Sequence, residues 1–231
     1  MTTSNNLDAT TAPPLAHPGH AQNRQWWDEV TPVHARSEMY DVAGFLAGKP
    51  ALDRLESDWL GEVAGRRVLH LQCHFGKSTI ELARRGAAAV VGVDFSPVAL
   101  ATARDLAQKA GLADRVTFIE SDVLLLDNVL HEQFDIIFTS YGVLGWLSDL
   151  YRWGEVVAKL LKPGGRFVIV EIHPTLMMLD WEDGKFTVKY GYFHCADGLE
   201  LPPMPDYADN SYVPQAQTRE WQWSPPMSFA V

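Results

Sequence analysis

Five apolar runs alternate with helical segments between residues 65 and 174, and this alternation constrains the fold more than any other feature of the chain. The runs are continuous in Val, Ile and Leu, which is typical of strands buried on both faces. Strands that alternate with helices indicate a parallel sheet with right-handed crossovers. We therefore predict an α/β fold with a Rossmann-like, doubly wound and mostly parallel sheet. The expected strands are 68–71, 88–94, 116–120, 134–140 and 166–172, and the expected helices are 77–85, 97–110, 123–130 and 147–161.

The first expected strand ends in a turn, and the second ends in an acid. The sequence Val68-Leu-His-Leu-Gln-Cys-His-Phe-Gly76 leads into a helix, and Val90-Val-Gly-Val-Asp94 follows it. Such a turn brings backbone N–H groups and a helix N-terminus towards an anionic ligand group. An acid at the end of the next strand can take two ribose hydroxyls. This order predicts a site for an adenosine-containing cofactor.

The ends of the third and fourth strands face the same edge of the sheet, where ligands bind in open parallel sheets. The third strand ends at Glu120-Ser-Asp122, and a carboxylate there can accept a hydrogen bond from an adenine amino group. The fourth ends at Thr139-Ser-Tyr141, which we expect beneath the reacting end of the ligand. Asp94 and Asp122 also fit ordinary helix N-caps, and capping is compatible with ligand binding.

Together these residues resemble the class I S-adenosylmethionine-dependent methyltransferases. The first motif of that family usually reads Val-Leu-Asp-Leu-Gly-Cys-Gly-x-Gly, and Leu160-Leu-Lys-Pro-Gly-Gly-Arg-Phe167 is the most specific further sign. The likeness covers residues 26–174. With Trp-Leu-x-Asp-Leu at 146–150 and Glu-x-His-Pro at 171–174, the Leu-Gln-Cys-His-Phe-Gly variant is similar to a bacterial small-molecule subgroup. The resemblance implies methyl transfer from S-adenosylmethionine to O or N of a small-molecule acceptor, with S-adenosylhomocysteine as product.

The resemblance also implies which residues bind the cofactor, although this chain departs from the usual turn. His70 stands where the family has an acid, and Gln72 and His74 stand where it has glycine. Either the turn lies further from the cofactor, or Gln72 and His74 donate hydrogen bonds to the cofactor carboxylate; we expect the second. The implied cofactor-binding residues are His70, Gln72, His74, Gly76, Asp94, Phe95, Ser96, Asp122, Val123 and Ser140.

A hydroxyl or protonated amine acceptor requires a base. The candidates are His173 after the fifth strand, His34 in the N-terminal segment and Tyr141 after the fourth strand. Each also fits a non-catalytic role: His173 as a loop brace, His34 as a surface residue and Tyr141 as pocket lining. A mechanism by alignment alone, without a base, stays open.

The chain divides into four expected parts. Residues 1–22 lack an apolar period and are predicted to be a disordered tail, and 23–64 to be a helical cap. Residues 65–174 form the cofactor-binding core, and 175–231 a β and loop extension. Resembling enzymes usually add two further strands to reach seven, and these are expected to be missing here. We expect residues 186–193 to cover the open sheet edge, unless a second subunit of a homodimer does so.

Charge and composition argue against several kinds of partner and site. A net charge of −10 argues against nucleic-acid and anionic-membrane partners, and no apolar run is long enough to span a bilayer. Two cysteines give no disulfide framework, so a cytoplasmic location is expected. His70 and Cys73 would point to opposite strand faces, so no metal site is predicted. The alternatives are an NAD-dependent oxidoreductase, which shares the strand–turn–helix pattern, and a non-catalytic S-adenosylmethionine-binding protein.

Overall fold

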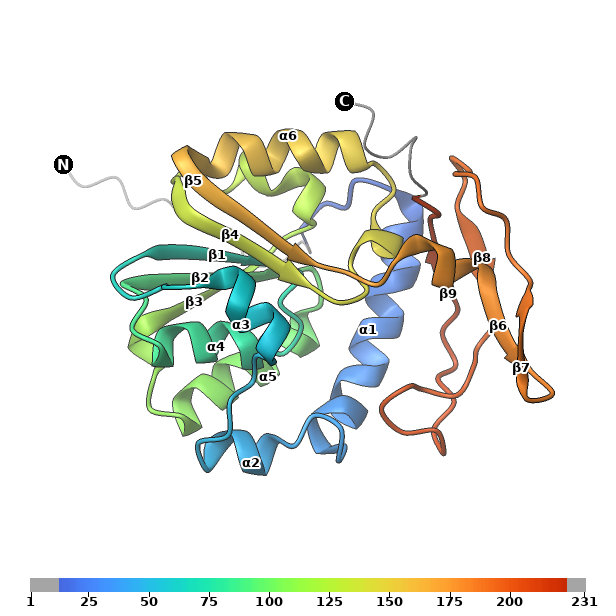
Figure 1. The fold of residues 1–231 in the computed structure, drawn as a ribbon, viewed down its shortest axis with the longest axis horizontal. Helices are drawn as coiled ribbons and strands as arrows, with labels where there is room; N and C mark the ends of the chain where they lie inside the picture. The colour runs from blue at the N-terminus through green and yellow to red at the C-terminus, as the bar shows by residue number, and fades with distance from the viewer. Residues whose placement is uncertain (1–12, 224–231) are drawn as a thin grey trace.

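A five-stranded parallel sheet forms the centre of the protein (Figure 1). The computed structural model describes residues 13–223. The strand order β3-β2-β1-β4-β5 reverses direction between β1 and β4, as in doubly wound folds, and the predicted fold class is confirmed. The strands are β1 (Arg67–Leu71), β2 (Ala89–Asp94), β3 (Val116–Glu120), β4 (Phe134–Ser140) and β5 (Leu161–Val170), and every neighbouring pair is parallel.

Helices bury both faces of this sheet. One apolar core joins the sheet to α4 (Lys77–Arg84), α5 (Pro97–Lys109) and the shorter α3 (Arg54–Leu60). The other joins it to α6 (Leu150–Leu160) and the 3₁₀ turn η2 (Val123–Asn128). Successive β1 residues, Val68 and Leu69, enter opposite cores and are both fully buried, which explains the continuous apolar strands. Two short 3₁₀ turns, η1 (Ala113–Arg115) and η3 (Leu144–Trp146), lie in the connections.

Helix α1 (Pro18–Arg36) runs across the carboxyl ends of the strands and is followed by α2 (Val42–Leu46) (Figure 1). The expectation of a disordered tail up to residue 22 is therefore wrong for residues 18–22. Pro18 occupies the first helical position, and the His17 side chain accepts a hydrogen bond from the Gly19 N–H, which starts the helix early. Residues 1–12 of that expected tail lie outside the described residues.

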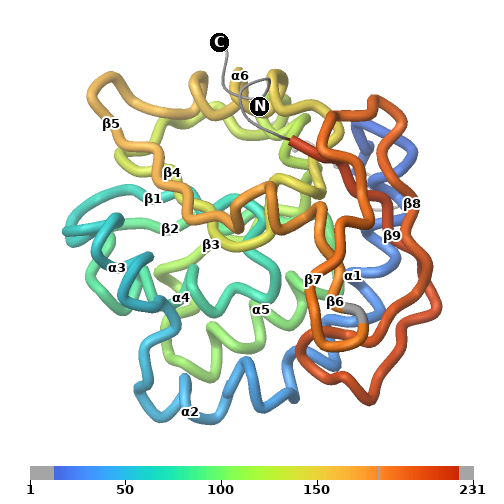
Figure 2. Tube along the Cα trace, turned by 45° about the vertical axis from the view of Figure 1, so that its right-hand side comes forward, coloured from blue at the N-terminus to red at the C-terminus, as the bar shows by residue number. Residues whose placement is uncertain are grey.

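The extension packs on the side of α1 that faces away from the sheet (Figures 1 and 2). After the 3₁₀ turn η4 (Pro174–Met178), β6 (Leu179–Glu182) pairs antiparallel with β7 (Lys185–Val188), and β8 (Leu199–Leu201) pairs with β9 (Thr218–Glu220). The expectation that residues 186–193 cover the edge of the central sheet is wrong. Residues 185–188 pair with β6 instead, because a turn at Asp183-Gly184 with positive φ closes a local hairpin.

Among residues 13–223, no helix is long and apolar enough to cross a membrane. The same residues contain no group of His, Cys, Asp and Glu side chains arranged to hold a metal ion.

Candidate active site

Three residues of the turn between β1 and α4 have positive φ, a conformation that favours glycine, although only Gly76 of the three is glycine. Gly76 has φ +73°, and a Cβ there would lie 2.7 Å from the Phe118 ring, so a side chain does not fit. Gln72 and His74 each have φ 51°, in the left-handed region. This conformation costs a non-glycine residue roughly 1–2 kcal/mol. The turn therefore carries two side chains at positions where glycine would be less strained.

Each of these two side chains has one partnered and one unpartnered polar atom. The Gln72 Nε2 donates to the Val143 carbonyl at 2.9 Å, and His74 Nε2 lies 3.0 Å from His34 Nδ1. Gln72 Oε1 and His74 Nδ1 are buried, and neither has a hydrogen-bond partner among the described residues. The free atom of Gln72 is thus an acceptor, whereas the sequence led us to expect a donor to the cofactor carboxylate.

His70 lies inside the core rather than at the surface of the turn. Its Nδ1 is 2.8 Å from Thr79 Oγ1 and its ring packs 4.9 Å from that of Phe138. Burial lowers the pKa of His70 to about 3, so the imidazole is neutral. The position that usually supplies an acid therefore supplies no negative charge here.

Asp94 ends β2 and is held by the backbone of two neighbouring loops. Its two carboxylate oxygens accept hydrogen bonds from the His74 N–H at 2.8 Å and the Ser96 N–H at 2.9 Å. Burial raises the pKa of Asp94 to about 6. Ser96 caps α5 through the Ala99 N–H, and its hydroxyl donates to Asp28 of α1 at 2.5 Å. Phe95, between them, is partly buried.

Asp122, after β3, caps η2 and also holds the start of α1. Its Oδ1 accepts from the Leu124 N–H, and its Oδ2 accepts from the Ala16 N–H at 2.9 Å and lies 2.5 Å from His20 Nδ1. Burial alone would raise the pKa of Asp122, but the hydrogen bond and charge of His20 and the backbone donors lower it overall. The adjacent Val123 is buried in the core beneath α6. The acid expected on the adenine side is thus covered by the N-terminal residues.

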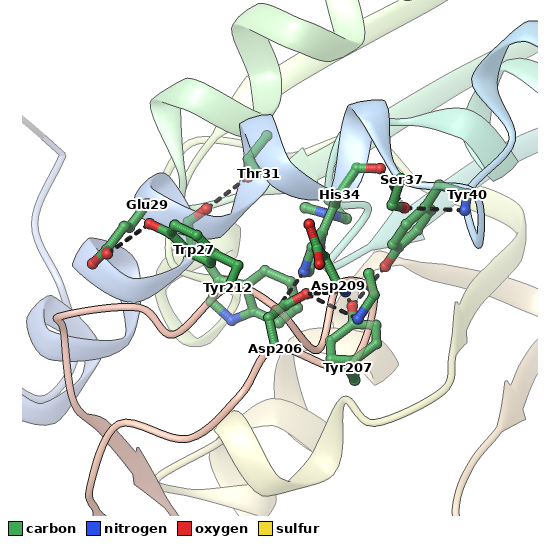
Figure 3. Close-up of polar contacts among 12 residues, drawn as sticks. Trp27, Glu29, Thr31, His34, Ser37, Tyr40, Asp206, Tyr207, Asp209 and Tyr212 are labelled. Carbon is green, nitrogen blue, oxygen red and sulfur yellow. Dashed lines mark hydrogen bonds and ion pairs between the residues drawn. The ribbon is translucent and has the colours of Figure 1, made fainter.

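His34 of α1 belongs to a polar cluster that sequence reasoning did not detect (Figure 3). Its Nε2 lies 2.9 Å from Asp206 Oδ2, and both side chains are fully buried. Burial lowers the pKa of His34, although the hydrogen bond and charge of Asp206 oppose this. The Tyr207 hydroxyl lies 3.4 Å from His34 Nδ1 and 2.6 Å from the Tyr40 hydroxyl. Asp206 lies in an irregular, proline-rich loop with no periodic pattern, so nothing in the sequence paired it with His34.

The other base candidates lie further along the same edge. His173 is exposed, and its Nδ1 accepts a hydrogen bond from the Thr175 N–H at the start of η4. Tyr141 is 45% exposed, and its hydroxyl donates to Asp53. Ser140 precedes it and hydrogen-bonds to Glu56, and its side chain is partly buried. The structure therefore brings His34 and His74 together and leaves His173 and Tyr141 separate from that pair.

Aromatic rings cover the turn from the α1 side. The Trp27 ring packs 4.9 Å from that of His74, and Trp26 stacks on Trp146 at 5.6 Å. Glu171 holds the loop that carries Trp146, because its carboxylate accepts hydrogen bonds from the backbone N–H groups of Val143 at 2.7 Å and Leu144 at 2.9 Å. The turn, the acids and these rings define one polar and aromatic site at the carboxyl edge of the sheet.

Comparisons with known proteins show which proteins this part of the chain resembles. Residues 68–165 match the family described as "Methyltransferase domain". The chain is 35% identical over 120 residues to a 2-phytyl-1,4-naphtoquinone methyltransferase of Nostoc punctiforme, covering 50% of each chain. It therefore spans about half the length of the curated relatives it matches.

Two solved structures share the fold at moderate identity. An S-adenosylmethionine-dependent methyltransferase from Mesorhizobium loti is 29% identical, with a TM-score of 0.50, covering 62% of this chain and 66% of its own. The [4+2]-cyclase SpnF is 27% identical, with a TM-score of 0.54, covering 69% of this chain and 61% of its own. Residues 68–165 thus resemble a methyltransferase domain, and these likenesses support the predicted cofactor, S-adenosylmethionine, and the predicted enzyme class.

Proposed function

We propose that this protein transfers the methyl group of S-adenosylmethionine to an oxygen or nitrogen atom of a small-molecule acceptor. The observation that carries the proposal is the match of residues 68–165 to the methyltransferase domain, in which Asp94 ends β2 and Asp122 follows the adjacent β3 at one edge. The net charge of −10 favours a metabolite over a nucleic acid as the partner.

The cofactor would bind across the ends of β1, β2 and β3. Asp94 would accept the ribose hydroxyls, and Asp122 the adenine amino group once the start of α1 shifts from it. Gly76 lets the turn pack closely against Phe118 and Ala103 beneath this edge, because a Cβ there would lie 2.7 Å from the Phe118 ring. The other proposed contacts come from residues along the same edge: His70, Gln72, His74, Phe95, Ser96, Val123 and Ser140.

The chemistry requires alignment and, for a protonated acceptor, removal of a proton. The sulfonium is already activated: the bond between sulfur and the methyl carbon breaks, its electron pair stays on sulfur, and the acceptor lone pair forms the new bond. Holding the acceptor in line behind the methyl carbon lowers the barrier. His173 is the first base to test, because it is exposed and its hydrogen bond is to a single backbone N–H. His34 and Tyr141 are the other proposed bases.

The acceptor pocket would be lined by aromatic rings. Trp26, Trp27 and Trp146 lie beside the turn and would stack on a planar ring. A relative is named for a phytyl naphthoquinone, which supports a ring-containing acceptor. We further propose a cytoplasmic protein with no nucleic-acid or membrane partner, and a second copy of the chain as a partner to be tested by sedimentation.

The experiment that tests the function has two stages. Thermal melting with S-adenosylmethionine, S-adenosylhomocysteine and NAD separates the cofactor classes, and we expect the first two to raise the transition while NAD does not. Release of S-adenosylhomocysteine is then measured over fractionated metabolite pools. Stabilisation by NAD alone would favour an oxidoreductase instead.

A second function is a protein that binds S-adenosylmethionine without transferring its methyl group. It is favoured by the likeness to SpnF, a structure named as a cyclase, and by the unusual turn at Gln72 and His74. Tight cofactor binding with no S-adenosylhomocysteine formed from any pool would select this alternative.

A further inference from the structure

Two unpartnered acceptors lie in one short turn. Among residues 13–223, four buried side-chain polar atoms lack a hydrogen-bond partner, and Gln72 Oε1 and His74 Nδ1 are two of them. Buried polar atoms without partners are rare in native proteins and are costly. Both residues are also held at φ 51°, where glycine would be less strained. Strain and unpaired atoms at the same two residues point to a ligand that these side chains meet.

A chain of hydrogen bonds that begins at Asp206 determines which ring nitrogen of His74 carries the proton. Asp206 Oδ1 accepts the backbone N–H groups of Ala208 at 2.9 Å and Asp209 at 3.1 Å. Its Oδ2 faces His34 Nε2 at 2.9 Å, and a carboxylate can only accept, so His34 carries its proton on Nε2.

The chain continues from His34 to His74. Burial lowers the pKa of both imidazoles, so each is neutral and has one N–H. His34 Nδ1 is therefore bare, and His74 Nε2, 3.0 Å away, must donate to it. This leaves a bare lone pair on His74 Nδ1. The Tyr207 hydroxyl, 3.4 Å from His34 Nδ1, is compatible with this arrangement because it is a second donor to the same nitrogen.

The free polar atom of Gln72 is also a hydrogen-bond acceptor, for a simpler reason. Only its amide nitrogen can bind the Val143 carbonyl, so its oxygen is the free atom. The turn thus carries two acceptors. In β1 the position that usually holds an acid is His70, which is neutral and hydrogen-bonded to Thr79. Two neutral acceptors suit a ligand group that carries several N–H donors, such as an ammonium group.

We propose that Asp206, acting through His34, makes the turn an acceptor pair for the ammonium group of the cofactor's methionine portion. This rests on the proposed use of S-adenosylmethionine. Gln72 Oε1 and His74 Nδ1 accept hydrogen bonds from the ammonium group, and Asp206 and His34 are positioning residues that keep His74 in the required tautomer. A carboxylate that is remote in sequence replaces the acid that the first strand lacks.

The test is Asp206→Asn, measured by calorimetry with S-adenosylhomocysteine and with its analogue that lacks the amino group. The asparagine oxygen stays on the two backbone N–H groups, and its NH₂ then faces His34 Nε2. His34 and His74 each move their proton to Nδ1, so the turn presents a donor to the ammonium. We expect affinity for S-adenosylhomocysteine to fall about tenfold or more, the usual effect of losing a hydrogen bond to a charged group. Affinity for the analogue should not change.

Asp209→Asn is the matched control, because Asp209 caps Ser211 in the same loop and does not reach His34 through its side chain. Nitrogen NMR of the histidine rings supplies a readout independent of ligand: we expect Nε2–H on His34 and His74 in the wild type, and Nδ1–H on both in the variant. Equal affinity of Asp206→Asn and wild type, or an equal loss for both ligands, would overturn the proposal. So would a wild-type spectrum with Nδ1–H on His74, which decides the matter even if the variant does not fold. A wild type that fails to bind S-adenosylhomocysteine would instead refute the proposed function.

Discussion

At the scale of single residues, Gln72 combines backbone strain with a useful hydrogen bond. Its left-handed conformation costs roughly 1–2 kcal/mol, and the hydrogen bond from its side-chain amide to the Val143 carbonyl offsets about 1 kcal/mol of this. We expect Gln72→Gly to leave the free energy of unfolding within about 1 kcal/mol of wild type. Gln72→Ala loses the same hydrogen bond but keeps the strain, so it should be about 1 kcal/mol less stable than Gln72→Gly. Urea unfolding measures both; equal stability of the two variants would show that the backbone there is unstrained.

Asp94 makes the stability of the fold depend on pH. Its pKa is raised to about 6 by burial, so the folded state takes up this proton at a higher pH than the unfolded chain does. The contribution of Asp94 to stability therefore rises as the pH falls from 7 through 6, by about 1 kcal/mol between pH 7 and 5. Asp94→Asn removes this dependence, whereas Asp105→Asn, an exposed control, keeps it. Unfolding measured across this pH range checks the prediction, and parallel curves for wild type and Asp94→Asn would contradict it.

At the scale of elements, helix α1 would compete with the proposed cofactor for the carboxyl edge of the sheet. The Ala16 N–H and the His20 ring both contact the Asp122 carboxylate, and Asp28 accepts a hydrogen bond from the Ser96 hydroxyl. We expect His20→Ala to bind S-adenosylhomocysteine a few-fold more tightly, because one competing hydrogen bond is removed. His17→Ala is the control, since His17 caps the same helix without bonding Asp122. Calorimetry decides: weaker binding by His20→Ala would mean that His20 assists the cofactor.

Elements with local signals were predictable from the sequence, and elements held by distant contacts were not. The five central strands follow from apolar runs and glycine punctuation, and Asp94 and Asp122 follow from their place after strands. The residues before α1 are held against the sheet by the hydrogen bond from Ala16 to Asp122, 106 residues away in the chain. The protonation of His74 depends on the contact between Asp206 and His34, which are 172 residues apart. No periodicity connects such pairs. Residues 186–188 do form part of a strand, but they pair with β6, whose pattern is too short to be recognised in the sequence.

At the scale of the whole molecule, the extension and the central sheet pack against opposite sides of α1. Asn23 exchanges two hydrogen bonds of 2.7 Å with the backbone of Arg219 in β9. Glu29 accepts a hydrogen bond from the Tyr212 hydroxyl (Figure 3). It also accepts from the backbone N–H groups of Gln215 and Ala216. The Trp221 N–H donates to the Gly145 carbonyl, which ties β9 to the loop after β4. Asp206 lies in the same connection between β8 and β9 as the residues that contact Glu29. The geometry of the site therefore depends on this packing.

This arrangement predicts that the core and the extension unfold together. Asn23 is fully buried, so Asn23→Ala leaves the Arg219 N–H and carbonyl without partners and should lower the free energy of unfolding by about 2 kcal/mol. Gln25→Ala, on the exposed side of α1, should have little effect. Far-ultraviolet circular dichroism follows the helices of the core, and tryptophan fluorescence includes Trp221 and Trp223 of the extension. We expect the two transitions to coincide in wild type and to shift together in Asn23→Ala. A fluorescence transition at lower denaturant than the dichroism transition would show instead that the extension is a separate unit, and the link from Asp206 to the turn would then be lost before the core unfolds.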